Sequence, residues 1–190
     1  MNKRQVWIVD FGSQYTQLIT RKTRELGYSC EIITYDDSVA LWKDGKRPQA
    51  IVLSGVPLSI ASDENDYSFY FEEKIPLMGI CYGMQIISQE MGGKVEQGIS
   101  GEYGKAEIHF SKGYQIKGCK NELNVWMSHF DHVSIPPENF EVILESKNNF
   151  IAAIKHKELA ILGYQFHPEV DHTENGKELL EYFYQQLAQL

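Results

Sequence analysis

One cysteine lies in the part of the sequence best suited to nucleophilic chemistry. Cys81 is the central residue of Gly-Ile-Cys-Tyr-Gly at residues 79–83, which follows an apolar run and precedes apolar residues at helical spacing. This Gly-x-Cys-x-Gly pattern is typical of a nucleophile elbow, in which two glycines allow a strand to turn sharply into a helix. The partial positive charge at the start of a helix favours a thiolate over a thiol. The pattern therefore predicts that Cys81 is a nucleophile.

A histidine with a carboxylate two residues later supplies a matching base. Among six histidines, His167 lies in Phe-His-Pro-Glu at residues 166–169, at the end of a predicted strand. In extended backbone, residues i and i+2 point to the same side, so we expect Glu169 to accept a hydrogen bond from the imidazole and fix its tautomer. Alone, each motif also fits an ordinary role, a core cysteine or a surface turn. Together, Cys81, His167 and Glu169 indicate a catalytic triad.

The elements that must position these residues follow from the hydrophobic pattern. Apolar runs bounded by turn residues predict buried strands at residues 6–9, 28–35, 50–53 and 77–80. Helices are predicted at residues 14–26 with Gly27 as C-cap, at 39–42, within 62–74 and from the elbow to Gly92. This alternation predicts an α/β fold, a three-layer, open and mostly parallel sheet with helices on both faces, flavodoxin-like in arrangement.

The second half of the chain has a different pattern. Strands are predicted at residues 94–97, 105–110, 125–127, 141–145, 150–155 and 160–166. Because few helical segments separate them, we expect antiparallel pairs that extend or cap the sheet. Residues 173–190 have apolar side chains at helical spacing and predict an amphipathic closing helix, for which Thr173 is a suitable N-cap.

Composition limits the classes of function. A chain of 190 residues with 43% hydrophobic content is expected to form a single domain, residues 1–190. The formal net charge of −8 disfavours a nucleic-acid-binding surface, and no apolar run has the length needed to span a bilayer. The N-terminus has no signal-peptide pattern, and the three widely spaced cysteines favour neither disulfides nor a metal site. A cytoplasmic location is the expectation.

Several motifs together resemble one known family. The sequences at residues 79–85 and 166–169 are similar to those of class I glutamine amidotransferases, which carry a Cys-His-Glu triad. More narrowly, the chain resembles the amidotransferase domains or subunits of GMP synthetases. The segments that carry this narrower resemblance are residues 9–17, 102–104, 126–129 and 167–173. The resemblance covers nearly the whole chain.

The resemblance implies a reaction and the residues that perform it. Cys81 would attack the side-chain amide of glutamine and form a γ-glutamyl thioester, with His167 moving protons and Glu169 holding His167. The backbone N–H groups of Val56 and Tyr82 would form the oxyanion hole. The residues implied to bind the glutamine are Gly55, Gln85, His129, Phe130 and Asp131.

The resemblance also implies a partner. The ammonia would pass to a GMP synthetase ATP-pyrophosphatase domain or subunit, which uses ATP and magnesium to convert xanthosine monophosphate (XMP) to GMP. Residues 1–190 contain no ATP-binding loop of that kind, so we expect no cofactor in this chain. The sequence fits either a separate subunit or one domain of a longer protein.

Two positions depart from the family pattern. Val56 replaces a glycine of the usual Ser-Gly-Gly-Pro, and Phe130 follows His129 where the subfamily has glycine. If position 56 needs a positive φ, a β-branched residue there costs about 1–2 kcal/mol. These departures leave open a catalytically weakened domain that mainly docks on or regulates a synthetase. A standalone peptidase or γ-glutamyl hydrolase is a third alternative, which the segments at residues 10–17 and 102–104 disfavour.

Overall fold

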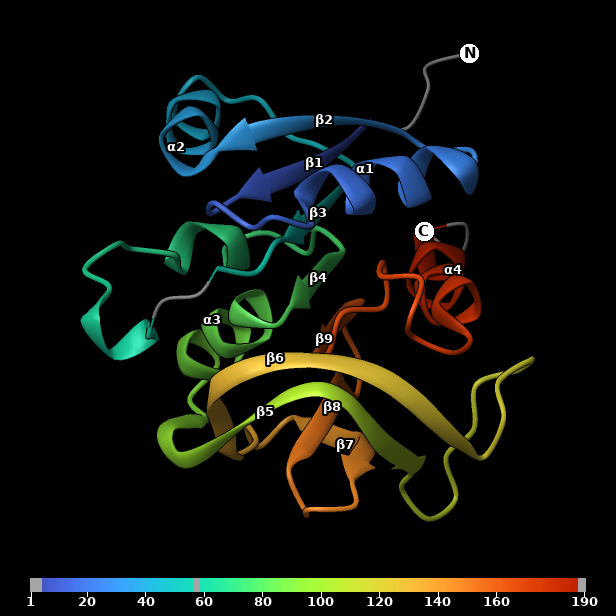
Figure 1. Cartoon of the computed structure of the whole chain (residues 1–190). Helices are drawn as coiled ribbons and strands as arrows, with labels where there is room; N and C mark the ends of the chain where they lie inside the picture. Colours follow the sequence, from blue (N-terminus) through green and yellow to red (C-terminus); the bar gives the residue numbers. More distant parts are fainter. Residues whose placement is uncertain (1–4, 57–58, 188–190) are drawn as a thin grey trace.

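Short, uniformly apolar segments form a parallel sheet because side chains on both of its faces are buried. The computed structural model describes residues 5–56 and 59–187, except the side chains of residues 99 and 100. Its parallel strands are β1 (Gln5–Asp10), β2 (Ser29–Thr34), β3 (Ala50–Leu53), β4 (Leu77–Ile80) and β9 (Ile161–Tyr164). They lie in the order β2-β1-β3-β4-β9, so β4 and β9 are neighbours (Figure 1). The predicted α/β architecture is confirmed.

Helices cover both faces of this sheet. They are α1 (Thr16–Glu25), α2 (Tyr35–Lys43), α3 (Tyr82–Glu90) and α4 (Gly176–Gln186). Along β1, Val6 and Ile8 pack in the core cluster that includes α1 and α4, whereas Trp7 and Val9 pack in the cluster that includes α2 and α3. The alternation along one strand therefore separates two cores, which gives the three layers.

The other strands form an antiparallel extension beyond β9. They are β8 (Ile151–His156), β7 (Phe140–Ser146), β5 (Lys94–Phe110) and β6 (Glu122–Ile135), in that order across the sheet. The two strands predicted within residues 94–110 are one long strand, whose pairing with β6 shifts between Gln97 and Glu102. In Figure 1, β5 and β6 cross beneath α3 and β9 as a long curved pair. This pair brings β6 to the carboxyl end of β4.

The helical predictions were correct in part. The closing helix is confirmed at Gly176–Gln186, with Leu179, Leu180 and Phe183 buried, and residues 188–190 of its predicted range lie outside the described residues. Residues 62–74, however, contain no α-helix, only the short 3₁₀ helix η2 (Ser68–Phe71), after η1 (Ile60–Ser62). In that loop the side chains of Asp63 and Asp66 accept hydrogen bonds from backbone N–H groups two residues on, at 3.0 and 2.9 Å. Such local bonds compete with helical ones.

Helix α2 is longer than predicted and begins at a capping box. The Thr34 hydroxyl accepts a hydrogen bond from the Asp37 N–H, and the Asp37 carboxylate accepts one from the Thr34 N–H. This reciprocal pair satisfies N–H groups that a helix leaves free at its start. No helix of the described residues is long and apolar enough to cross a membrane.

Candidate active site

The Gly-x-Cys-x-Gly segment forms a strained elbow between β4 and α3. Cys81 has φ 54° and ψ −105°, a backbone conformation that non-glycine residues rarely adopt and that concentrates at functional sites. A Cβ added at Gly79 would lie 2.3 Å from the Gly83 carbonyl, and one at Gly83 would lie 2.4 Å from the Leu53 carbonyl oxygen. Both glycines are therefore required by close backbone approach, as predicted.

The thiol of Cys81 is held between neighbouring strands. The Cys81 N–H donates to the Tyr164 carbonyl of β9 at 2.7 Å, which fixes the elbow against that strand. The sulfur donates to the Ser128 carbonyl of β6 at 3.6 Å and accepts from the Gln165 carboxamide at 3.8 Å. Sequence reasoning missed both neighbours. Only their position at the ends of predicted strands could have indicated them.

His167 and Glu169 form the predicted pair, but on a different backbone. The imidazole Nδ1 lies 2.8 Å from Glu169 Oε1, and both side chains are almost fully buried. The segment is a turn rather than an extended strand, because the Val170 N–H donates back to the His167 carbonyl at 3.4 Å. Pro168 occupies the second position of this turn, where its fixed φ is favourable. The contact was predicted correctly, and its geometric reason was wrong.

Thr173 supports this turn and does not cap the closing helix. Helix α4 begins at Gly176, with Asn175 as its N-cap residue. The Thr173 hydroxyl instead donates to the His167 carbonyl at 2.7 Å and accepts from the Trp126 N–H at 3.0 Å. The His167 N–H donates to the Trp126 carbonyl at 3.0 Å. The backbone of the histidine is thus tied to β6.

Cys81 and His167 come together beside Gly55. A Cβ added at Gly55 would lie 3.3 Å from the His167 ring and 3.4 Å from the Cys81 Cβ. Both residues line one cavity of about 210 Å³, together with Tyr15, whose ring meets the His167 ring edge-on. Burial opposes a charge on His167, but the Glu169 carboxylate and the hydrogen bond with Cys81 outweigh it and raise the pKa of His167. The site therefore stabilises the imidazolium that forms when His167 accepts a proton from Cys81.

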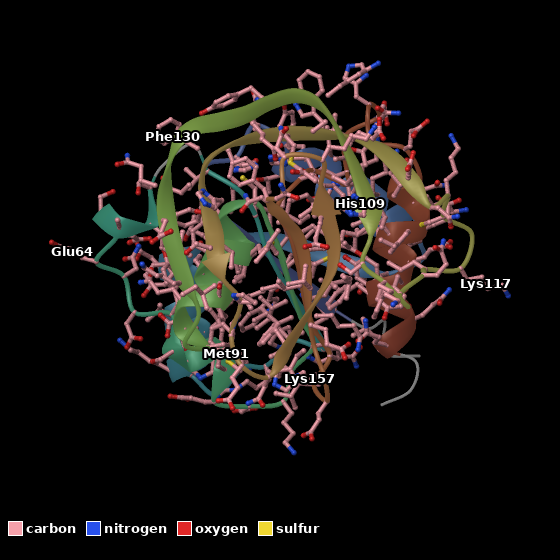
Figure 2. All side chains as sticks on the ribbon, turned by 90° about the horizontal axis from the view of Figure 1, so that it is seen from below. Glu64, Met91, His109, Lys117, Phe130 and Lys157 are labelled. Atoms are coloured by element: carbon pink, nitrogen blue, oxygen red, sulfur yellow. The ribbon has the colours of Figure 1, made fainter. Side chains whose placement is uncertain are left out.

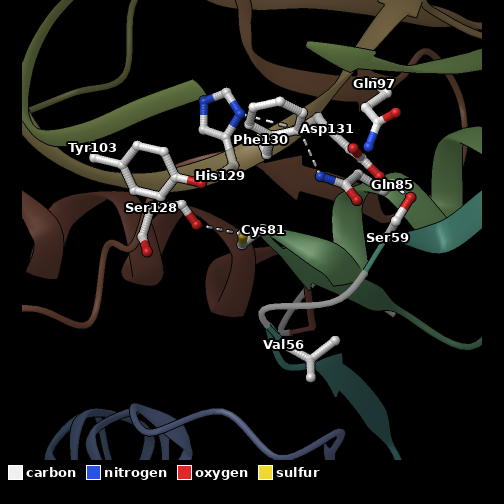
Figure 3. A pocket seen from close by; sticks show the side chains of 10 residues that line it. All are labelled: Val56, Ser59, Cys81, Gln85, Gln97, Tyr103, Ser128, His129, Phe130 and Asp131. Atoms are coloured by element: carbon white, nitrogen blue, oxygen red, sulfur yellow. Dashed lines mark hydrogen bonds between the residues drawn. The ribbon is translucent and has the colours of Figure 1, made fainter. Parts of the chain in front are cut away.

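A second cavity, of about 240 Å³, lies on the other side of Cys81 (Figure 3). It brings Cys81 together with residues from the loop after β3, from α3 and from β5 and β6. The lining residues are Val56, Ser59, Cys81, Gln85, Gln97, Tyr103, Ser128, His129, Phe130 and Asp131. Four of the five residues predicted to bind substrate therefore line one pocket, and Gly55 precedes Val56 at its edge.

Hydrogen bonds connect several of the residues that line this pocket. The Asp131 carbonyl accepts from Gln85 Nε2 at 2.9 Å and lies 3.0 Å from the His129 Nδ1. The Ser59 hydroxyl donates to the Asp131 carboxylate. Gln85 Oε1 is buried and has no hydrogen-bond partner among the described residues. A buried unpaired acceptor of this kind suits a ligand that donates a hydrogen bond.

The buried carboxylate of Glu102 contacts the imidazole of His129. His129 Nε2 lies 3.4 Å from Glu102 Oε2, while Glu102 Oε1 accepts from Ser146 at 3.1 Å and from Asn148 at 2.9 Å. Burial alone would raise the pKa of Glu102, but its hydrogen bonds, that of His129 first, lower it below the usual value. Residues 102–104 contributed to the family resemblance, but the sequence did not predict that Glu102 contacts His129.

Neither of the two departures from the family pattern, Val56 and Phe130, has a positive φ. The described non-glycine residues with positive φ are Cys81, Asn149 and Asn175, so Val56 does not carry the backbone strain that its substitution for glycine suggested. Phe130 is 40% exposed and lies at the edge of the molecule, beside β5 (Figure 2). It is also one of the residues that line the pocket. The other residue predicted for the oxyanion hole, Tyr82, is the first residue of α3, and backbone N–H groups at the start of a helix have no partner within the helix.

The fold and this site define a class of protein. The family model for class-I glutamine amidotransferases matches residues 7–187, and the chain belongs to that family. Within it, the chain is similar to GMP synthases named as glutamine-hydrolysing. It is 44% identical over 186 residues to that of Francisella philomiragia and 47% identical over 185 residues to that of Brachyspira hyodysenteriae. Each alignment covers 96% of this chain but 36% of the relative, so the chain spans about a third of their length.

A solved structure shows the same architecture over the whole chain. It is a candidate subunit of GMP synthase from Thermoplasma acidophilum, with a TM-score of 0.87 and 31% identity. The match covers 100% of this chain and 96% of that one. A glutamine amidotransferase of Thermotoga maritima, at 19% identity and a TM-score of 0.69, supports the fold alone.

Proposed function

We propose that this chain hydrolyses glutamine to glutamate and ammonia through a Cys81-His167-Glu169 triad. The observation that carries the proposal is the elbow itself. Cys81 is held at φ 54° between two glycines that admit no Cβ, beside a histidine whose other nitrogen lies 2.8 Å from a buried carboxylate. This arrangement of nucleophile, base and orienting group is the one that activates a weak nucleophile. Membership of the class-I family supplies the substrate, glutamine.

In the proposed reaction, the Cys81 thiol transfers its proton to His167, and the sulfur attacks the side-chain amide carbon of glutamine. The oxygen of the tetrahedral intermediate becomes negatively charged and accepts hydrogen bonds from the Val56 and Tyr82 N–H groups. His167 then returns the proton to the amide nitrogen, the C–N bond breaks and ammonia leaves. Water, deprotonated by His167, attacks the thioester, the C–S bond breaks and glutamate leaves, and the proton on His167 returns to the Cys81 sulfur. Glu169 keeps the imidazole in one tautomer throughout.

The pocket on the far side of Cys81 would hold the amino-acid end of glutamine. We assign this role to Gly55, Gln85, His129, Phe130 and Asp131, which are at or next to that pocket. The unpaired Gln85 Oε1 is an acceptor for a substrate N–H group, and the Asp131 carboxylate complements a substrate ammonium. The pocket volume of about 240 Å³ suits a small molecule.

We further propose that the ammonia is used by a synthetase partner that converts XMP to GMP. The support is that curated relatives named GMP synthase are about three times longer than the region they share with this chain. On this proposal ATP and magnesium act in the partner domain or subunit, and the chain itself needs no cofactor. The alternative, a weakened domain that only docks on a synthetase, was raised by the departures at Val56 and Phe130, and the absence of a positive φ at Val56 and the exposure of Phe130 count against it.

A coupled assay tests the proposal. The chain is mixed with the synthetase part of a glutamine-hydrolysing GMP synthase, XMP, ATP and magnesium, and GMP is measured with glutamine or with ammonium chloride. We expect glutamine-dependent GMP formation with the unaltered chain and none with Cys81→Ser, while ammonium supports both. Ammonium-dependent formation without any glutamine-dependent formation would favour the docking alternative.

A further inference from the structure

Gln165 is a buried polar residue beside Cys81 that has no role in the reaction described above. The sheet places it there, because β9 pairs with β4 in parallel so that Ile80 faces Tyr164. The residues that follow, Cys81 and Gln165, then lie side by side at the same edge. Gln165 has no exposed surface, and its backbone N–H donates to the Ala152 carbonyl at 2.9 Å.

The carboxamide of Gln165 has one hydrogen bond, and it is to the reactive sulfur. Its Nε2 donates to Cys81 Sγ at 3.8 Å, whereas its Oε1 is buried without a partner among the described residues. A side chain that served only the core would be expected to have its polar atoms paired, or to be apolar. The position of this carboxamide is therefore explained by the sulfur and not by the packing around it.

The two polar neighbours of the sulfur favour different protonation states. The Ser128 carbonyl, 3.6 Å away, accepts a hydrogen bond from a thiol and repels a thiolate (Figure 3). An amide N–H does the opposite, because a donor stabilises the charged form of an acceptor. When the proton moves to His167, the bond from Gln165 becomes charge-assisted and stronger.

We propose that Gln165 is a positioning residue that stabilises the Cys81 thiolate by donating a hydrogen bond to it. The proposal rests on the proposed role of Cys81 as nucleophile. The side chain of Gln165 donates its hydrogen bond to the nucleophile, and Gln165 is not among the residues that line either cavity, so its removal is expected to affect the chemical step rather than the binding of glutamine.

Two variants and one control separate this role from packing. Gln165→Met removes the donor at similar volume, and Gln165→Asn keeps a carboxamide that is one methylene too short to reach the sulfur. Gln49→Met makes the first change at an exposed position. The probe is iodoacetamide, an uncharged reagent that alkylates thiolates. The rate of Cys81 alkylation is followed by peptide mass spectrometry from pH 5 to 10, and a thermal melt of each variant checks folding.

We expect alkylation near neutral pH to be about tenfold slower in both Gln165 variants, with the pH profile displaced to higher pH and the same rate at its upper end. In the coupled assay, kcat should fall by a similar factor while KM for glutamine changes less than about twofold. Gln49→Met should match the unaltered chain. If Gln165→Met does not fold, the pH profile of Gln165→Asn alone tests the proposal.

A pH profile in either folded Gln165 variant that matches the unaltered chain would overturn the proposal. So would a slower rate at every pH without displacement of the profile, because that result indicates altered access to the sulfur. A failure of the proposed function gives a different result. In that case the unaltered chain itself would not react at Cys81 with a glutamine-derived diazoketone.

Discussion

The two sides of Cys81 are built differently. On one side, His167 and Glu169 are almost fully buried, and the backbone of His167 is bonded to β6 and to the Thr173 hydroxyl. On the other side, the pocket edge is formed by the loop at Val56 and by β5 and β6, whose pairing shifts in register between Gln97 and Glu102. There Tyr103 is 67% exposed and Phe130 is 40% exposed. The reacting groups are fixed by the core, and the pocket edge is not.

This difference explains which substitutions the chain tolerates. A change at the elbow or at the histidine turn collides with backbone or leaves a buried charge unpaired, as the 2.3 and 2.4 Å approaches at Gly79 and Gly83 illustrate. A larger side chain at the pocket edge can extend into solvent, as Phe130 does. The departures from the family pattern are accordingly at the edge. Substitutions on the two sides should therefore differ in effect by orders of magnitude.

The largest effect is expected for Glu169→Gln on the buried side. The amide keeps the shape but can donate to Nδ1 and stabilise the wrong tautomer of His167, so kcat should fall by about 10³–10⁴-fold with little change in KM. The coupled assay measures both constants, and Glu158→Gln, an exposed change of the same kind, serves as control. A loss smaller than about tenfold would mean that Glu169 does not orient the base.

The buried side should also make stability depend on pH. Because the pKa of His167 is raised in the folded state, the imidazolium contributes stability that is fully present below pH about 6.5 and is lost as the pH rises through the folded-state value. We expect the free energy of unfolding of Cys81→Ser minus that of Cys81→Ser/His167→Gln to fall by on the order of 1 kcal/mol between pH 6 and pH 9. Urea titrations measure it, and a constant difference would contradict it.

On the pocket side, Phe130→Ala should have a small effect. The ring lines the pocket but is partly exposed, so its removal should change KM for glutamine by less than about threefold and leave kcat within about twofold. Steady-state kinetics in the coupled assay test this. A rise in kcat/KM of tenfold or more would show that the ring obstructs the pocket, and the contrast between the two sides would then be wrong.

The smallest effect is expected for Val56→Gly. If position 56 had a positive φ, glycine would relieve the strain of a β-branched residue there and raise turnover. Val56 does not have a positive φ, so kcat should stay within about twofold of the unaltered value. Val56→Ala is the matched control, because it removes the β-branch without adding backbone freedom. A severalfold gain for glycine but not for alanine would show that backbone strain limits the reaction.

Features that depend on residues close in the sequence were predicted, whereas contacts between residues far apart in the sequence were missed. The parallel strands, the elbow and the pairing of His167 with Glu169 depend on neighbours in the sequence, so residue types and spacing predicted them, although the extended backbone expected at His167 was wrong. The contacts of Gln165 with Cys81 and of Glu102 with His129 join residues 84 and 27 positions apart. They depend on which strands pair and in which register. A helix cap was one possible role for Thr173, and it was wrong for the same reason, because the hydroxyl accepts from Trp126 on β6 and donates to the His167 carbonyl.

The central claim is that Cys81 attacks the amide carbon of glutamine in this pocket. The most direct test is to incubate the chain with a glutamine-derived diazoketone, with and without a synthetase partner, XMP and ATP, and to locate the adduct by peptide mass spectrometry. We expect one adduct, on Cys81, that excess glutamine prevents and that Cys81→Ser abolishes. No adduct under any of these conditions, or an adduct on Cys30 or Cys119 instead, would contradict it.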